Sequence, residues 1–201
     1  MKGLLFVLSL FLFSSSLLAQ HSCAHTEQRK KMQKEHPELI PGQEARRQFL
    51  ENFTHNFSTN QSVQSSVNLL IPVVFHVVHN NGVENISDSQ IQESIVQLNE
   101  DFAAVNPGLV DVHPNFTDLV ANVGFEFRLA ELDPYGDPST GINRIQSELT
   151  YNGSDIALKQ MIQWDPTMYL NIWVVFSSDG GNGSAFAYYP ADVEGSASIY
   201  D

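Results

Sequence analysis

The chain has 201 residues, which is enough for one ordinary domain with appendages and for a core that needs no metal or disulfide. Apolar residues make up 42% and charged residues 16%, a composition that excludes a disordered chain and a coiled coil. The net charge of −13 is uneven: residues 52–201 hold 18 acidic side chains and three basic ones, and so acidic a surface excludes nucleic acid as a partner.

The first nineteen residues predict a secretory signal peptide. Basic Lys2 precedes an apolar run over residues 4–18, and the small residue Ala19 follows it. The run is shorter than the roughly 20 apolar residues of a membrane span. A lipid anchor on Cys23 is the alternative, but residues 20–22 are not the small, apolar lead-in that such processing needs. We therefore expect cleavage near Ala19, a secreted protein, and no membrane contact after cleavage.

Residues 20–66 differ in composition from the rest of the chain. They contain six basic side chains and little periodic apolar content, which is typical of a linker or a pro-segment. Short helices are expected around residues 27–34 and 43–53. The predicted organisation is a signal peptide (1–19), a pro-segment or linker (20–66) and a globular domain (67–201).

The globular part opens with a strand and a helix. Residues 69–79 (LLIPVVFHVVH) are β-branched, aromatic and almost continuously apolar, which predicts a strand buried on both faces. Asn80-Asn81-Gly82 then forms a turn. Ser87 and Gln90 fit a capping box that starts a helix over 88–103. The apolar residues of that helix recur at helical spacing. They are Ile91, Ile95, Leu98 and Phe102.

Further elements follow in the second half of the chain. Residues 124–132 predict a second strand, 133–138 a turn cluster and 156–162 a short helix. Residues 169–176 predict a central strand and 185–189 a fourth strand. This order favours an α/β (α+β) fold, a twisted mixed sheet with backing helices. The buried strands are expected at 71–78, 125–131 and 170–176.

Two histidine clusters could suggest a metal site. His76 and His79 would share a metal on a helix, but on a strand they point to opposite faces, so a core or strand-end role is favoured. His21, Cys23 and His25 form a second cluster, next to the cleavage point, where adventitious binding is the weaker interpretation. Cys23 is the only cysteine, so an internal disulfide is excluded.

Other sequence motifs do not define an active site. The chain has no H-E-x-x-H, no G-x-S-x-G and no Walker-type loop. Seven N-x-S/T triplets are glycan acceptors in a eukaryote and a by-product of composition in a bacterium, and the bacterial interpretation is favoured. No stop signal precedes Asp201, so the chain looks cut rather than finished. The residues alone predict an exported acidic α/β domain and name no reaction.

Five stretches of the globular part share their order and spacing with a known family. They are IPVVFHVVHN (71–80), ISDSQIQESIVQLNEDFAAVN (86–106), FEFRLAELDPYGDPSTGINR (125–144), WDPTMYLNIWVV (164–175) and SAFAYYP (184–190). Through these stretches the chain resembles the pappalysins, secreted zinc proteases of the metzincin group. The resemblance implies the upper subdomain of a metzincin catalytic domain above a horizontal cleft.

The resemblance also implies where substrate would bind. The strand like Ser184–Tyr188 forms the upper rim of the cleft, where an extended peptide pairs through main-chain hydrogen bonds. The rim residues are Ser184, Ala185, Phe186, Ala187 and Tyr188. The family's zinc motif H-E-x-x-H-x-x-G-x-x-H is absent from these 201 residues, so no zinc ligand is transferred to His76, His79 or His113.

Cys23 is the one chemical residue that the resemblance carries over. Related bacterial proteins keep an early pro-segment cysteine whose thiolate occupies the open zinc position and keeps the enzyme latent. Cys23 has that place, although Ser22 and Ala24 stand where arginine and glycine are expected. An idle exported thiol is the alternative.

Two functions follow as hypotheses. The first is the N-terminal portion of a secreted zinc metalloendopeptidase made as a zymogen, with protein or peptide substrates. In that case the 201-residue chain alone is inactive, and Zn²⁺ belongs to the complete protein. The second is an exported non-catalytic binding or adhesion module with the same sheet. Calcium is compatible with an acidic exported protease, but no ligand loop is visible.

Overall fold

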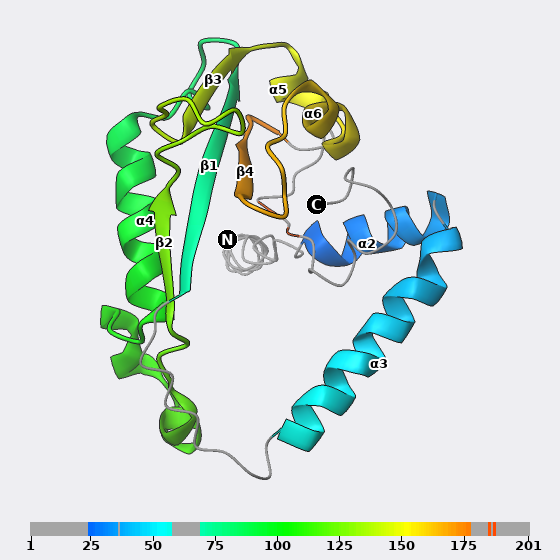
Figure 1. Cartoon of the computed structure of the whole chain (residues 1–201), viewed down its shortest axis with the longest axis vertical. Coiled ribbons are helices and arrows are strands. Elements are labelled where there is room, and N and C mark those ends of the chain that lie inside the picture. The colour runs from blue at the N-terminus through cyan, green and yellow to red at the C-terminus, as the bar shows by residue number, and fades with distance from the viewer. Residues whose placement is uncertain (1–23, 36, 58–68, 178–184, 186, 188–201) are drawn as a thin grey trace, which may run out of the picture.

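The computed structural model describes residues 24–35, 37–57 and 69–177, together with Ala185 and Ala187 (Figure 1). The expected signal peptide, Cys23 and most of the expected strand 185–189 lie outside these residues. No helix in the described ranges is both long and apolar enough to cross a membrane.

The longest strand, β1 (Leu69–His79), is the centre of a four-stranded sheet. β2 (Phe125–Leu129) and β3 (Ile142–Gln146) pair with one half of β1 each, and β4 (Leu170–Val174) pairs with its middle, residues 73–77. All three pairings are parallel. Residues 73–79 are buried, as expected for a strand covered on both faces. The α/β fold class predicted from the sequence is confirmed.

β2 and β3 follow one another along the same edge of β1. The amide of Ala130 donates to the Val73 carbonyl (2.9 Å) at the end of β2, and the amide of Phe75 donates to the Gly141 carbonyl (2.8 Å) before β3 begins. Between these contacts the chain loops out from the sheet and returns. Gly141 closes the loop with φ +69°, and a Cβ there would lie 2.7 Å from the Ala130 nitrogen, so only glycine fits without strain.

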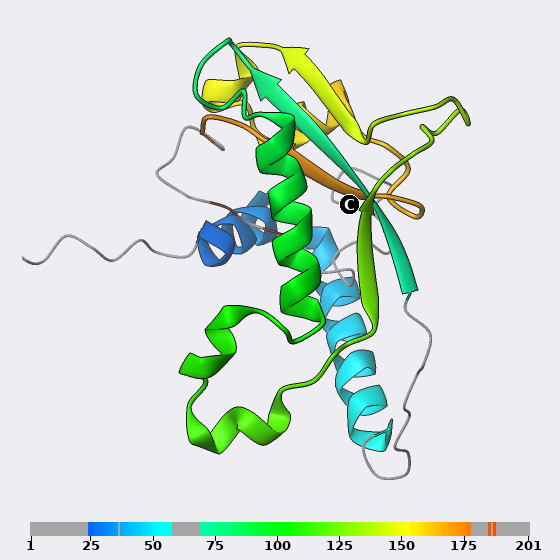
Figure 2. The ribbon, with the colours of Figure 1, turned by 90° about the vertical axis from the view of Figure 1, so that its left-hand side faces the viewer.

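The helix α4 (Asp88–Phe102) covers one face of the sheet (Figure 2). Ile91 is fully buried against the odd-numbered residues of β1 and against Phe127 of β2. The Phe102 and Phe127 rings meet edge to face, with centroids 4.8 Å apart. The predicted apolar stripe of this helix is therefore the one that packs on the sheet.

The connection between β1 and α4 is held by the Glu84 carboxylate. This side chain is almost fully buried and accepts hydrogen bonds from the amides of Asn80 (2.7 Å) and Gly82 (3.2 Å). The amide of Asn80, above all, lowers the pKa of the Glu84 carboxyl. A Cβ on Gly82 would lie 2.3 Å from that carboxylate, which explains a glycine in the turn.

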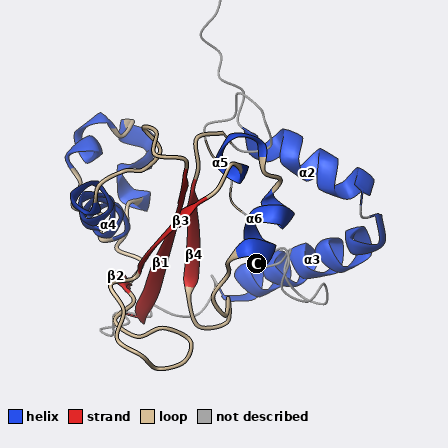
Figure 3. Cartoon of the chain, turned by 90° about the horizontal axis from the view of Figure 1, so that it is seen from above, coloured by secondary structure: helices blue, strands red, loops and turns tan. Residues whose placement is uncertain are grey.

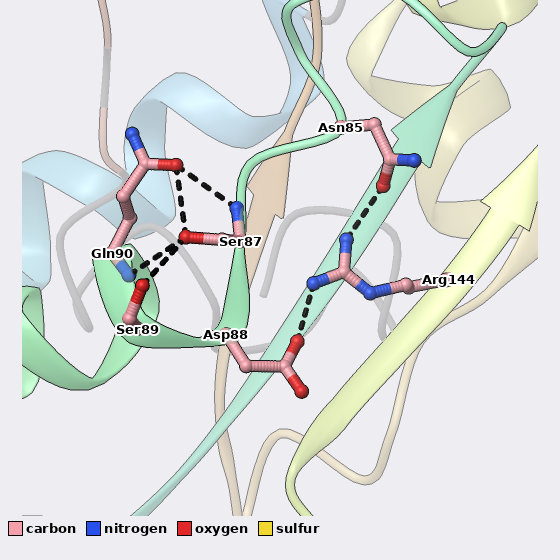
Figure 4. Close-up of polar contacts among 6 residues, drawn as sticks. All are labelled: Asn85, Ser87, Asp88, Ser89, Gln90 and Arg144. Atoms are coloured by element: carbon pink, nitrogen blue, oxygen red, sulfur yellow. Dashed lines mark hydrogen bonds and ion pairs between the residues drawn. The ribbon is translucent and has the colours of Figure 1, made fainter.

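The start of α4 is capped as predicted and is tied to β3 (Figure 4). The Ser87 hydroxyl accepts from the Gln90 amide (3.3 Å), and the Gln90 side chain accepts from the Ser87 amide (2.9 Å). Arg144 of β3 donates to the Asn85 side chain (2.6 Å) and forms an ion pair with Asp88. The carboxylate of Asp88 also favours the positive end of the helix dipole.

The opposite face of the sheet is covered by the segment between β3 and β4 (Figure 3). It contains α5 (Leu149–Asn152) and α6 (Asp155–Met161), the latter close to the predicted helix 156–162. Two buried aromatic residues after α6, Trp164 and Tyr169, pack on Val74 of β1. This second layer explains why the even-numbered residues of β1 are buried as well.

The front segment contains α2 (Ala24–Glu35), the 3-10 helix η1 (Pro37–Leu39) and α3 (Ile40–Phe57). Both α-helices enclose the short helices expected from the sequence. Two further 3-10 helices, η2 (Pro107–Asp111) and η3 (Pro114–Leu119), lie between α4 and β2.

Asn99 of α4 occupies the outer edge of β2. Its amide nitrogen donates to the Phe127 carbonyl (2.9 Å), and its amide oxygen accepts from the Phe127 amide (2.7 Å). One side chain thus replaces a neighbouring strand at that residue. An edge strand is open to pairing with another chain, and this contact blocks it.

Replacing Asn99 by Ala should therefore destabilise the chain by about 2–4 kcal/mol, because two main-chain groups of the buried Phe127 lose their partners. Urea unfolding measures the effect. Gln92→Ala, at an exposed position of the same helix, is the control and should change stability by less than about 0.5 kcal/mol. An Asn99→Ala variant as stable as the control would contradict this role.

Candidate functional site

The structure describes two of the residues expected to contact substrate. Ala185 and Ala187 are exposed, whereas Ser184, Phe186 and Tyr188 lie outside the described residues. Cys23 also lies outside them, immediately before α2. The site predictions at these positions remain predictions.

The strand that precedes the expected rim, β4, has an open edge. Among the described residues, β4 pairs with a strand on one side only, that of β1. Beyond β4 the edge is closed by α5, since the amides of Phe176 and Ser177 donate to the Thr150 hydroxyl and carbonyl, both at 2.9 Å. Main-chain groups of residues 170–174 are therefore left for a further strand.

On the face opposite α4, a fully buried histidine joins three strands. His76 lies in register with Asn143 of β3 and Trp173 of β4. Its Nε2–H donates to the Asn171 oxygen (2.9 Å), and its Nδ1 accepts from the Asn143 nitrogen (3.3 Å). These partners select the neutral Nε2–H tautomer. Burial lowers the pKa of His76, although the Asn171 contact acts in the opposite direction.

Asn171 extends this network into the segment before β4. Its oxygen accepts from the Trp164 amide (2.8 Å), and its nitrogen donates to the carbonyls of Trp164 (3.0 Å) and Tyr169 (3.2 Å). The His76 ring lies between two tryptophan rings, 6.3 Å from that of Trp164 and 5.3 Å from that of Trp173. One asparagine thus fastens the whole 164–169 segment to the sheet.

An open cleft of about 640 Å³ lies outside this network. The 133–139 turn and residues 159–165 line it, and Asn143 and Trp164 form part of its wall. The Lys159 ammonium lies 5.8 Å from the Trp173 ring centroid, a cation–π contact that offsets part of the cost of burying the charge. The His76 network therefore supports a wall of this cleft from behind.

The described histidines do not form a zinc site. Both ring nitrogens of His76 are engaged by asparagines, the Nδ1 of His79 accepts from the Asn81 amide (3.2 Å), and the Nδ1 of His113 accepts from the Asn115 amide (3.2 Å). Within the described ranges, no group of three His, Cys, Asp or Glu residues could hold a metal ion. The residues present in this part of the chain do not fit a catalytic zinc ion.

The network around His76 was missed at the level of the sequence. Asn143, Asn171 and Trp164 were not singled out, although a signal exists. A polar residue inside a buried apolar strand, such as His76 or Asn171, needs a partner on a neighbouring strand. Which partner it finds depends on strand register, which the sequence does not print.

Comparison with known proteins gives a fold match. No protein-family model matches the chain, and no curated protein matches it either. A solved structure of mirolysin with a small compound is 39% identical over 54% of this chain and 42% of that chain, with a TM-score of 0.50. Mature mirolysin of Tannerella forsythia with a cleaved peptide has the same identity and coverage and a TM-score of 0.49.

The pro-form of the same protein matches over more of the chain. A variant of Tannerella forsythia promirolysin is 30% identical over 89% of this chain and 56% of that chain, with a TM-score of 0.64. These neighbours are a metzincin-type metalloprotease, so the fold is that of a metalloprotease-related domain. The particular protein it resembles is mirolysin, and the chain spans about half of mirolysin's length.

The two coverages bear on the front segment. A match to 89% of 201 residues involves about 179 residues, and only 133 residues follow residue 68. At least about 46 matched residues therefore precede β1. The mirolysin match that covers 54% of the chain involves about 109 residues, which is the number from 69 to 177.

The buried histidine makes stability depend on pH. The pKa of His76 is lowered in the folded state, so the folded protein binds fewer protons than the unfolded one, and stability falls as pH drops below the unfolded value of about 6.5. Between pH 7.5 and 5.5 this histidine accounts for a loss of at most about 1.4 kcal/mol.

His76→Gln should therefore lose less stability over that interval than the wild type, whatever its absolute stability. Denaturant unfolding at the two pH values measures the difference, and His113→Gln, at an exposed position, is the control with unchanged pH dependence. Equal pH dependence in the wild type and His76→Gln would show that His76 is not held neutral by burial.

Proposed function

We propose that this chain is the N-terminal part of a secreted zinc metalloendopeptidase of the pappalysin type, made as a zymogen. The observation that carries the proposal is the match to promirolysin, 30% identical over 89% of the chain. The 39% identity to mirolysin over the sheet region supports the same assignment for the globular part. Because the chain spans 56% of promirolysin, the activity is proposed for the complete protein.

The segment before β1 acts, in this proposal, as the pro-segment. At least about 46 residues of the promirolysin match precede β1, and α2 and α3 lie there. The segment carries the basic side chains, whereas residues 52–201 carry an excess of acidic ones. Opposite charges favour association of the two parts before cleavage.

Protein or peptide substrates are proposed to bind along the sheet edge. The outer edge of β4 has no strand partner among the described residues, and the predicted rim residues Ser184–Tyr188 follow β4 in the chain. A strand added in this region gives an extended peptide a main-chain ladder to pair with. This chemistry accepts many sequences, because main-chain hydrogen bonds do not depend on side chains.

Zinc is proposed for the complete protein only. The described histidines are engaged by other partners, so zinc ligands would have to come from outside the described residues. Secretion is part of the same proposal and rests on the signal-peptide pattern of residues 1–19. Export explains an acidic protein with a single cysteine.

The test compares the 201-residue chain with the complete reading frame. The chain alone should cleave no casein and retain no stoichiometric zinc after desalting. The complete protein, once residues 20 to about 66 are removed, should cleave casein and hold one zinc ion per molecule. A matured complete protein without peptidase activity would select the non-catalytic module, and zinc lost from the short chain only on changing His76 or His79 would contradict the assignment of its ligands.

A Cys23→Ser variant of the complete zymogen tests latency in the same assay. Serine keeps the side-chain volume nearly unchanged but removes the soft, easily deprotonated donor. The variant zymogen should be active before the pro-segment is cut, or mature faster, whereas the mature enzyme should be indifferent. A Cys23→Ser zymogen as silent as wild type would show that bulk occlusion by the pro-segment, and not this thiol, keeps the enzyme latent.

A further inference from the structure

The helix α3 has two opposite faces of different chemistry. Arg47 forms ion pairs with Glu44 (2.6 Å) and Glu51, and Gln48 donates to Glu44 (2.9 Å). Positions 44, 47, 48 and 51 fall on one stripe of a helix with 100° per residue. This stripe faces solvent, and its ion pairs are those of an exposed helix surface.

The apolar stripe lies on the other side of the same helix. Phe49, Leu50 and Phe53 are centred about 180° from the polar stripe. Their exposed fractions are 57%, 44% and 55%, and the two phenylalanine rings stack with centroids 6.4 Å apart. An amphipathic helix gains most of its stability by burying its apolar stripe, so about half of that stabilisation is unused here.

The described sheet does not account for this stripe. α3 packs on η1, while the strands pack on one another and on α4. In Figures 1 and 3, α3 lies on the side of the sheet away from α4 and apart from the strands. The core clusters of the sheet contain no residue of α3.

A second copy of the chain is a poor occupant. Two half-exposed phenylalanines and a leucine offer roughly 300 Å² of apolar area. A stable association between separate chains takes about 800 Å² per partner. A contact of this size is effective within one polypeptide, where a tether supplies a high effective concentration.

Resting on the proposed function, we propose that the apolar stripe of α3 is the docking surface for the part of the complete protein that the chain does not span, the zinc-binding half. The segment that contains α3 is matched in promirolysin, and 56% of promirolysin is covered by this chain. The remaining length is the part of that relative available to cover the stripe. The partner is an apolar patch of that half.

Docking at α3 makes the pro-segment a two-point clamp. Residues before α2 would act at the reaction centre, and α3 would hold the second half against the first. Each contact raises the effective concentration of the other, so losing the α3 contact loosens the pro-segment without touching Cys23.

Backbone hydrogen–deuterium exchange tests this in the complete zymogen. The amides of α3 should exchange at least about tenfold more slowly in the complete zymogen than in the 201-residue chain. The double variant Phe49→Ser/Phe53→Ser should bring exchange to within about threefold of the chain. Gln48→Ser/Asn52→Ser, with the same spacing on the polar side, should keep the protection.

Three results would overturn the proposal. They are equal exchange of α3 in the complete zymogen and in the chain, loss of protection in the control pair as well, and protection that grows with protein concentration, which indicates a second copy. The casein assay on matured wild-type protein is scored separately. Activity without α3 protection removes the docking surface and leaves the protease, whereas protection without activity removes the protease and leaves the contact.

Discussion

The fold depends on one strand that is paired along both edges and buried on both faces. Over residues 73–77, β1 has β4 on one edge, while β2 and then β3 take the other. The odd-numbered side chains pack on α4, and the even-numbered ones pack on the segment that holds Trp164 and Tyr169. Every other described element of the globular part is placed by its contact with this strand or with a neighbour of it.

A buried sheet of this kind tolerates polar groups only in pairs, and the pairs hold the connecting segments. Asn99 satisfies the outer edge of β2, and Asn171 ties the 164–169 segment to His76. Leaving any of these groups without a partner costs more than the net gain of one hydrogen bond. The same contacts therefore decide where the cleft wall and the β4 edge lie, and through them where a substrate could bind.

Much of this arrangement follows from sequence patterns, and some of it does not. The apolar run of β1 and the capping box of α4 predicted both elements close to their bounds, because burial and capping are local signals. The strand β3 (INRIQ) was not predicted, since its short alternation of polar residues resembles a loop. Its formation depends on Gly141, whose positive φ returns the chain to the edge that β2 has left.

The site was less accessible than the fold. The separation of His76 from His79 follows from strand geometry, but the Asn143 and Asn171 partners depend on register between distant segments. Cys23 and most of the rim came from a family resemblance and lie outside the described residues. Chemistry that assembles from several parts of a protein cannot be derived from local spacing.

The most direct test of the central role of β1 is amide hydrogen exchange of the chain resolved to single residues. The account predicts that the amides of Val73 to Val77 are the slowest in the chain, opening only with global unfolding, because these residues are paired on both edges and covered on both faces. Amides of α3 should exchange far faster. Slower exchange in α4 or β2 than in these residues of β1 would contradict the account.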